Sequence, residues 1–249
     1  MIKPIIQKIF NGFGYEIKKK NIRDIFTIRQ NFEEALVHIH TRGYTPDFII
    51  DVGAADGTPA LQKTFSTSRF FWIEPLKEFE PTLKSLQQKH NGEYIISGVG
   101  KEEGNFVLHV HKDLHGSTMF NETDGASADG SPREVSVTTL NKLAITNDWR
   151  QYKKILLKVD VQGFELEVLK GAEEIMENIE VVLLEVSFFR FLKGAPDFYE
   201  VITYMKSIGY VVYDIISGIN RPLDFALGQK DLVFVKENGF FRQSQGWEK

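Results

Sequence analysis

Short apolar runs recur along this chain, separated by stretches whose apolar residues fall at helical spacing. Continuous runs of this kind are typical of strands buried on both faces of a parallel sheet. Their alternation with helical stretches predicts an α/β fold built on a doubly wound sheet. We expect strands at 48–52, 69–74, 93–97, 105–110, 135–138, 154–160, 179–186, 210–214 and 231–235, and helices at 57–66, 76–90, 140–149, 163–177 and 197–208.

One long segment, 111–133, breaks this rhythm. Its sequence, HKDLHGSTMFNETDGASADGSPR, lacks apolar periodicity and is rich in Gly, Ser, Asp and Asn. Loops of this length in compact domains are commonly lids or binding loops, so we predict an active-site loop here. No linker divides the rest of the chain. We therefore expect a helical extension at 1–46 followed by a single domain at 47–249.

The first twenty residues, MIKPIIQKIFNGFGYEIKKK, place apolar side chains near helical spacing among lysines. This pattern predicts a helix that rests on an anionic membrane surface, which would give peripheral membrane contact through residues 1–20. A helix docked on the domain or on a partner subunit is the alternative. No stretch has the length of a transmembrane helix, and nothing resembles a cleavable signal peptide.

Composition narrows the function classes. The 249 residues are 42% hydrophobic and 26% charged, as is ordinary for a soluble globular protein. A net charge of −4 argues against nucleic acid as the main partner, because a basic footprint is missing. The chain has no cysteine, which excludes disulfides, thiolate nucleophiles and zinc–thiolate sites and suits the cytoplasm.

The stretch FIIDVGAADG at 48–57 runs from an apolar strand into Gly53 and Gly57. Glycines at such a turn let backbone N–H groups approach a ligand, or let the chain turn sharply into a helix. The spacing matches neither the dinucleotide fingerprint G-x-G-x-x-G nor a P-loop. Glu74, 21 residues after Gly53, ends the next strand, where an acid can accept hydrogen bonds from both ribose hydroxyls of an adenosine.

A glycine-rich first turn and a ribose-binding acid, without a pyrophosphate cradle, point to S-adenosylmethionine as the cofactor. Two alternatives stay open. In the first, glycine is needed at the turn only for packing, and Glu74 is only a solvated surface acid. In the second, the same order of strand, glycine turn, helix and acid belongs to a nicotinamide-dependent oxidoreductase.

Further segments then occur in one order: DVGAADG, FFWIEP, VSVTTLNKL, LLKVDVQGFELEVLKGAE and VVLLEV. Together they resemble the FkbM family of S-adenosylmethionine-dependent O-methyltransferases, over roughly residues 47–186. The resemblance implies a class I methyltransferase fold. This is a Rossmann-like, seven-stranded, mostly parallel sheet with helices on both faces and an antiparallel last strand.

The resemblance also implies which residues bind the cofactor. Three segments contribute, one after each of the first three strands. The implied residues are Asp51, Gly53, Ala54 and Gly57 around the methionine part, Glu74 and Pro75 at the ribose, and Gly98 and Val99 beside the adenine.

Methyl transfer to a hydroxyl releases a proton, so a carboxylate or an imidazole within hydrogen-bond reach assists it. Asp160 ends the fourth strand of the sheet, at the edge where such folds bind ligands, and is our first candidate for base or substrate-orienting group. Glu185, near the end of the fifth strand, is the second. Lys158 lies on the same side of its strand as Asp160 and pairs with such a carboxylate or acts in catalysis. His115 begins the long loop and is a further candidate base.

Two positions depart from the family pattern, Gln162 where many relatives have Glu and Asn141 where Asp is more common. A Gln cannot serve as a base, so a non-catalytic binding module that keeps the cofactor pocket is an alternative to an enzyme.

We predict no metal site, although two alternatives exist. A magnesium ion could lie between Asp160 and Glu185, because hard cations use carboxylate oxygens. His109 and His111 would share one face of a strand and, with a carboxylate, could bind a transition metal.

The run SFFRFLKG at 187–194 follows the fifth strand, beside the expected acceptor site. Its phenylalanines could stack on a sugar ring while Arg190 grips an anionic group, or they could be buried in the core. The whole pattern predicts an O-methyltransferase for a small-molecule or carbohydrate acceptor. The resemblance suggests a sugar in a cell-surface polysaccharide or glycolipid precursor, methylated in the cytoplasm or at the inner face of the membrane.

Overall fold

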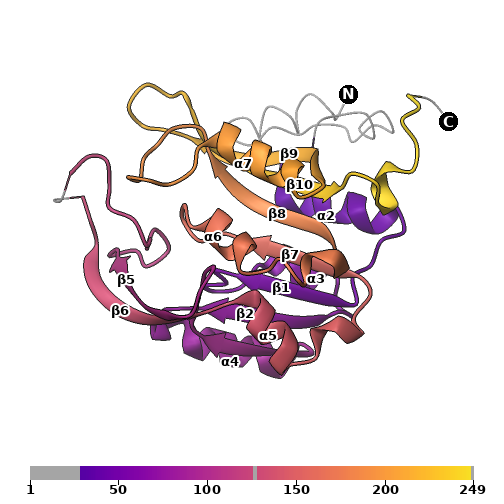
Figure 1. The fold of residues 1–249 in the computed structure, drawn as a ribbon, viewed down its shortest axis with the longest axis horizontal. Coiled ribbons are helices and arrows are strands. Elements are labelled where there is room, and N and C mark those ends of the chain that lie inside the picture. Colours follow the sequence, from indigo (N-terminus) through magenta and orange to yellow (C-terminus); the bar gives the residue numbers. More distant parts are fainter. Residues whose placement is uncertain (1–28, 126–127, 248–249) are drawn as a thin grey trace, which may run out of the picture.

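The computed structural model describes residues 29–125 and 128–247, and its centre is a seven-stranded sheet in the order β3-β2-β1-β7-β8-β10-β9 (Figure 1). From β3 to β8 neighbouring strands run parallel, whereas β10 is antiparallel to both of its neighbours. The predicted α/β sheet with a reversed last strand is confirmed. The strands are β1 Phe48–Val52, β2 Arg69–Glu74, β3 Gly92–Ile96, β7 Ile155–Val159, β8 Ile179–Ser187, β9 Tyr210–Asn220 and β10 Leu227–Lys236.

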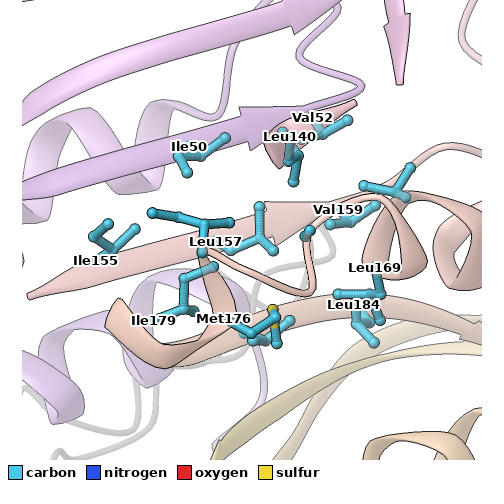
Figure 2. Close-up of a cluster of buried hydrophobic side chains, with 14 of the residues drawn as sticks. Ile50, Val52, Leu140, Ile155, Leu157, Val159, Leu169, Met176, Ile179 and Leu184 are labelled. Carbon is cyan, nitrogen blue, oxygen red and sulfur yellow. The ribbon is translucent and has the colours of Figure 1, made fainter. Parts of the chain in front are cut away.

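Alternate side chains of the central strands enter two different cores. Ile50 and Leu157 point to one face of the sheet, whereas Ile49 and Leu156 point to the other. Figure 2 shows the first cluster, in which Leu157 lies among side chains from neighbouring strands and helices. Because both faces are covered, β1 and β7 are buried at every position, which explains their continuous apolar runs.

Helices cover both faces, as predicted. Buried side chains of α5, α6 and α7 belong to the cluster of Figure 2, and those of α2, α3 and α4 belong to the opposite one. The helices are α2 Phe32–Thr41, α3 Pro59–Thr64, α4 Glu80–Lys89, α5 Leu140–Thr146, α6 Glu165–Lys170 and α7 Phe198–Ser207, with 3-10 turns η2 Lys77–Phe79, η3 Trp149–Gln151, η4 Met176–Asn178 and η5 Phe240–Arg242.

The helix expected at 163–177 is shorter than predicted. It ends at Lys170, and a separate 3-10 turn follows at Met176–Asn178. Gly171 is the cause, because a Cβ atom there would lie 2.0 Å from the carbonyl oxygen of Gly100. The close approach of these two backbones requires glycine, and glycine ends helices readily.

The strands expected at 105–110 and 135–138 form a separate three-stranded sheet, in the order β4-β6-β5. Its strands are β4 Gly98–Val99, β5 Gly104–Val110 and β6 Ser131–Thr138. Since β6 begins at Ser131, the long loop spans 111–130 rather than 111–133. Figure 1 shows the β5–β6 hairpin and the turn between β9 and β10 on the same side of the main sheet.

The described part of the expected extension, residues 29–46, contains α2. Ala35, Leu36 and Ile39 of this helix are buried in the same core as the side chains of β1 and β2. The membrane contact predicted for residues 1–20 lies outside the described residues. Within the ranges that the structure describes, no helix is long and apolar enough to cross a membrane.

Candidate functional site

A pocket opens at the carboxyl ends of β1, β2 and β7, which is where open α/β sheets bind ligands. Gly53, directly after β1, has a φ of +70°, and a Cβ atom there would lie 1.8 Å from the carbonyl oxygen of Asp160. Only glycine fits this position, so the turn after β1 passes directly against the end of β7. The pocket wall therefore includes bare backbone at Gly53.

Seven of the predicted site residues line this pocket: Gly53, Glu74, Pro75, Gly98, Val99, His115 and Asp160. Five do not line it. Asp51, Ala54 and Gly57 of the first motif, together with Lys158 and Glu185, lie behind the wall or beyond its edge. Unpredicted apolar side chains complete the wall, namely Val52, Ala55, Ile73, Leu76, Phe79, Leu108, Leu114, Met119, Val161 and Phe164.

The carboxylate of Glu74 is held by the backbone around it. One oxygen accepts from the N–H of Ala55 and the other from the N–H of Leu76, both at 2.9 Å. Burial raises the pKa of Glu74, and the two backbone hydrogen bonds oppose that rise. Each oxygen keeps a second acceptor site for a ligand. Glu74 is therefore a fixed pair of acceptors on the pocket wall, which suits two adjacent hydroxyls.

Behind this wall, Asp51 is fully buried and accepts from the Thr58 hydroxyl at 3.0 Å. Its second oxygen lies 3.2 Å from Nζ of Lys158, which also lies 3.5 Å from Asp160. Burial alone would lower the pKa of Lys158, but the charges of Asp51 and Asp160 outweigh burial and raise it. A charged Lys158 thus links the buried Asp51 to Asp160, whose side chain is 36% exposed at the pocket.

Beyond Asp160, two amides meet on Glu185. Nε2 of Gln162 donates to Oδ1 of Asp160 and to Oε2 of Glu185, at 3.0 Å each. Nε2 of Gln229 donates to the same Glu185 oxygen at 2.9 Å. Oε1 of Glu185 makes no hydrogen bond within the described residues.

Burial is the main reason that the pKa of Glu185 rises to about 8. The negative charges of Asp160, Glu165 and Asp231 add to the rise, against the hydrogen bond from Gln162. A carboxyl group with such a pKa can give up or accept a proton near neutral pH.

Sequence reasoning missed the role of Glu165, the first residue of α6. Its Oε1 accepts from the backbone N–H groups of Val161 and Gly163, at 3.1 Å each. The turn between them has a positive φ at Gln162, +51°, and at Gly163, +95°. The spacing DVQGFE contained the signal, since a buried acid just after a tight turn commonly binds backbone N–H groups.

The long loop 111–130 covers one side of the pocket with Leu114, His115, Ser117 and Met119. It is fastened to the turn after β7, because the buried Thr118 donates to the carbonyl oxygen of Gln162 at 2.7 Å. A β-bridge between Glu122 and Leu192 joins it to the loop after β8.

His115 lies at the mouth of the pocket. Its side chain is 59% exposed, lies 3.5 Å from Asp56 and packs against the Phe79 ring, with 5.2 Å between ring centroids. His115 lines the same pocket as Asp160, whereas Glu185 does not line it.

The segment after β8 divides between packing and exposure. Phe188 stacks on Phe198 of α7, with 4.7 Å between ring centroids. Arg190 forms ion pairs with Asp197 and Glu200, at 3.2 and 3.1 Å. Both carboxylates contact Nη2 of a side chain that is 57% exposed, so the anion-binding role expected for Arg190 stays a prediction.

The magnesium alternative is not supported. The amide nitrogen of Gln162 lies between Asp160 and Glu185, at hydrogen-bond distance from both. Over residues 29–125 and 128–247, no group of three His, Asp or Glu side chains is placed to hold a metal ion. Nε2 of His111 lies 3.6 Å from Glu122, so this histidine of the suggested pair faces a single carboxylate.

The pocket residues suit an adenosine-containing cofactor. Bare backbone at Gly53 allows close approach, the oxygens of Glu74 suit two ribose hydroxyls, and the apolar wall with Val99 and Phe164 suits a purine ring.

Comparison with known proteins agrees with this chemistry. The family described as "Methyltransferase FkbM domain" matches residues 51–212. The hexuronic acid methyltransferase AglP of Haloferax volcanii is 22% identical over 229 residues, which cover 91% of this chain and 89% of that protein.

Two solved structures are also similar at low identity. Magnesium protoporphyrin IX methyltransferase from Synechocystis PCC 6803 is 12% identical, with a TM-score of 0.45 over 94% of this chain and 96% of that one. The 1,6-didemethyltoxoflavin-N1-methyltransferase of Burkholderia thailandensis is 10% identical, with a TM-score of 0.44 over 94% of this chain and 87% of that one.

Proposed function

Because this chain belongs to the FkbM methyltransferase family, we propose that it transfers a methyl group from S-adenosylmethionine to a hydroxyl group of a sugar. S-adenosylmethionine-dependent methyl transfer is the reaction class of that family. The choice of a hydroxyl rests on one observation, the open oxygen of Glu185 beside the cofactor pocket. The choice of a sugar is supported by the relative whose name includes a hexuronic acid.

The cofactor supplies an activated methyl group when it is bound, so the chain's own residues must position the acceptor and remove a proton. Glu74 and the backbone at Gly53 hold the cofactor in this proposal, with Pro75, Gly98 and Val99 along the wall. Asp51, Ala54 and Gly57 shape the first turn from behind, and Lys158 fixes Asp160.

We assign the base to Glu185 and the orienting role to Asp160, which reverses the order expected from the sequence. Both oxygens of Asp160 are engaged, Oδ1 by Gln162 and Oδ2 by Lys158 at 3.5 Å. Glu185 has one oxygen fixed by two amides and one open. The proton of the acceptor hydroxyl passes to that open Oε1 as the oxygen–methyl bond forms. His115, at the mouth, is left to close the pocket over the bound cofactor.

Gln162 supports an enzyme rather than a binding module. A Gln in place of a Glu at position 162 suggested that catalysis had been lost. In the structure, however, the amide of Gln162 donates to the carboxyl groups of both Asp160 and Glu185. A polysaccharide or glycolipid precursor, reached near a membrane, remains the acceptor that we predict.

The test is calorimetric titration with S-adenosylmethionine, S-adenosylhomocysteine and NAD, followed by transfer of a labelled methyl group to a panel of glycosides. We expect the two methionine-derived ligands to bind and NAD not to bind. Glu74→Ala should weaken their binding about a hundredfold, because it removes hydrogen bonds to a charged group. Asp160→Ala should retain binding and lose most turnover.

Binding without transfer to any alcohol would contradict the proposal and support the binding module. Binding of NAD alone would support the oxidoreductase alternative. Full methylation by Asp160→Ala would remove Asp160 from the mechanism.

A further inference from the structure

Beyond the cofactor pocket, the side chains around Glu185 expose a specific set of hydrogen-bonding atoms. The Nε2 atoms of Gln162 and Gln229 both face a carboxylate, and only an NH₂ group can donate to one, so the orientation of each amide is fixed. Their Oε1 atoms make no hydrogen bond within the described residues, like Oε1 of Glu185. The Ser187 hydroxyl accepts from Gln229 at 3.4 Å and keeps its proton for a ligand.

We call these four residues, Gln162, Glu185, Ser187 and Gln229, the acceptor subsite. All four are partly exposed, and Gln162 also lines the cofactor pocket, so the subsite begins where that pocket ends. Several neutral donors and acceptors a few ångströms apart suit a ligand with several hydroxyl groups, because each hydroxyl both donates and accepts.

The charged groups around this subsite are mostly acidic. Asp160, Glu165 and Asp231 all act on Glu185, and Asp231 lies directly opposite Glu185 in the register of β10 against β8. Two cations act on this group of carboxylates. Lys158 is engaged by Asp51 and Asp160, and Lys230 acts on Asp231.

The arginines of the flanking loops are also engaged. Arg190 pairs with Asp197 and Glu200. Arg221, in the turn between β9 and β10, donates from Nε and Nη2 to both oxygens of Asp224. Its guanidinium carbon also lies 3.7 Å from the centroid of the Phe189 ring. Each guanidinium is thus already paired with at least one carboxylate of this chain.

From this balance we infer that the ring carrying the reacting hydroxyl is an uncharged sugar, not a uronic acid. The inference deepens the proposed function and rests on it. A carboxylate on that ring would be repelled by the surrounding acids, whose charge Lys158 and Lys230 already partly offset. An uncharged ring places its hydroxyls against the two amides, Ser187 and Glu185.

The inference is tested on the protein saturated with S-adenosylhomocysteine. The ¹⁵N side-chain amide signals of Gln162 and Gln229 are followed while methyl glycosides of glucose, galactose and mannose, and the matching hexuronates, are added. We expect at least one uncharged glycoside to shift both signals. Its hexuronate partner should bind more weakly by about tenfold or more.

Variants sharpen the comparison. Gln229→Leu should weaken binding of the uncharged glycoside, whereas Gln151→Leu, a control at the opposite edge of the sheet, should not. Asp231→Asn removes one negative charge and should improve hexuronate binding more than glycoside binding.

Equal or tighter binding of the hexuronates, or a failure of every uncharged ring to shift either amide signal, would overturn the inference. A different result would contradict the proposed function. A protein that binds uncharged rings at these amides yet transfers no methyl group would retain the subsite and lose the reaction.

Discussion

At the scale of single residues, the site depends on one neutral amide placed between two carboxyl groups. Gln162 donates to Asp160 and to Glu185 from the same nitrogen, and it does so from a left-handed backbone conformation. Two carboxylates this close would repel each other strongly without a shared donor or a proton. The amide supplies that donor and leaves Glu185 free to carry the proton. Protonation of Glu185 should therefore control activity.

The pH dependence of turnover follows from the pKa of Glu185, which burial and neighbouring acids raise to about 8. A base must be deprotonated, so kcat/KM should rise with pH and reach half of its limit near that value. Removing a neighbouring charge with Asp231→Asn should move the acid limb to lower pH. Glu185→Gln should lower kcat by about 10²–10⁴-fold, the range for a lost general base. The pH–rate profile of labelled methyl transfer measures all three.

Stability should change in the opposite direction to activity. The pKa of Glu185 is higher in the folded protein than in the unfolded chain. Its favourable contribution to the free energy of unfolding is therefore complete below about pH 4.3 and is lost as the pH rises to about 8. At pH 8 and above, Glu185→Gln should unfold at a higher denaturant concentration than the wild type. An inactive variant that is also less stable at that pH would show that Glu185 has a structural role instead.

Lys158 matters for the stability of the fold, through its ion pair with Asp51. Its replacement in Lys158→Met leaves Asp51, which is 0% exposed, without its ion-pair partner. Breaking a buried pair from one side costs about 3–5 kcal/mol of unfolding free energy, measured by urea denaturation. Lys170→Met, which removes an exposed pair with Glu167, should cost about 0.5 kcal/mol or less. Equal losses in the two variants would mean that Asp51 is not charged in the folded protein.

At the scale of elements, the turn from β7 into α6 sets the position of Gln162, a residue of the proposed acceptor subsite. Glu165 fixes this turn from the helix side, through Val161 and Gly163. Thr118 fixes it from the long loop, through the carbonyl oxygen of Gln162. A six-residue helix provides little rigidity of its own, so these side chains set the position of Gln162.

Glu165→Ala should therefore impair turnover, although Glu165 contacts neither ligand in the proposed mechanism. Two backbone N–H groups lose their acceptor, at about 1–3 kcal/mol each, and the turn shifts. We expect kcat to fall about a hundredfold, as for a small misplacement of reacting groups, while binding of S-adenosylhomocysteine changes little. Glu165→Gln keeps an acceptor oxygen and should recover most of the loss. Steady-state kinetics and calorimetry on both variants make the comparison, and no recovery with Gln would indicate that the charge itself matters.

At the scale of the whole molecule, the sheet brings the pocket and the proposed acceptor subsite to one edge. The cofactor pocket lies at the ends of β1, β2 and β7, and the acceptor subsite lies at the ends of β7, β8 and β10. The two core clusters pack against the shared strand β7 from both faces, and Figure 2 shows one of them.

Cofactor binding should therefore stabilise the whole domain. S-adenosylhomocysteine at a hundred times its Kd should add about 2.7 kcal/mol to the free energy of unfolding and raise Tm, because it binds only the folded state. NAD at the same concentration should leave Tm unchanged. A thermal shift assay distinguishes the two, and an equal rise with NAD would contradict the cofactor assignment.

The sequence could predict several residues that line the pocket, whereas it could not predict most of the contacts around Glu185. Gly53 follows β1 and Glu74 ends β2, and their positions are set by the parallel order of the sheet. Asp231 and Gln229 reach Glu185 only because β10 inserts antiparallel beside β8, in a register that no local pattern specifies. The end of α6 at Gly171 depends likewise on a backbone approach from a distant strand end.

The bridge between Glu122 and Leu192 also affects how the two ligands should enter and leave the site. It ties the loop over the cofactor pocket to the loop that borders the acceptor subsite. The N–H of Thr123 strengthens the tie through a 2.8 Å hydrogen bond to the carbonyl oxygen of Phe191. We expect two loops joined in this way to move together, so the two ligands should not enter and leave independently. The departure of the spent cofactor should be slowed whenever a fresh acceptor already occupies the neighbouring site.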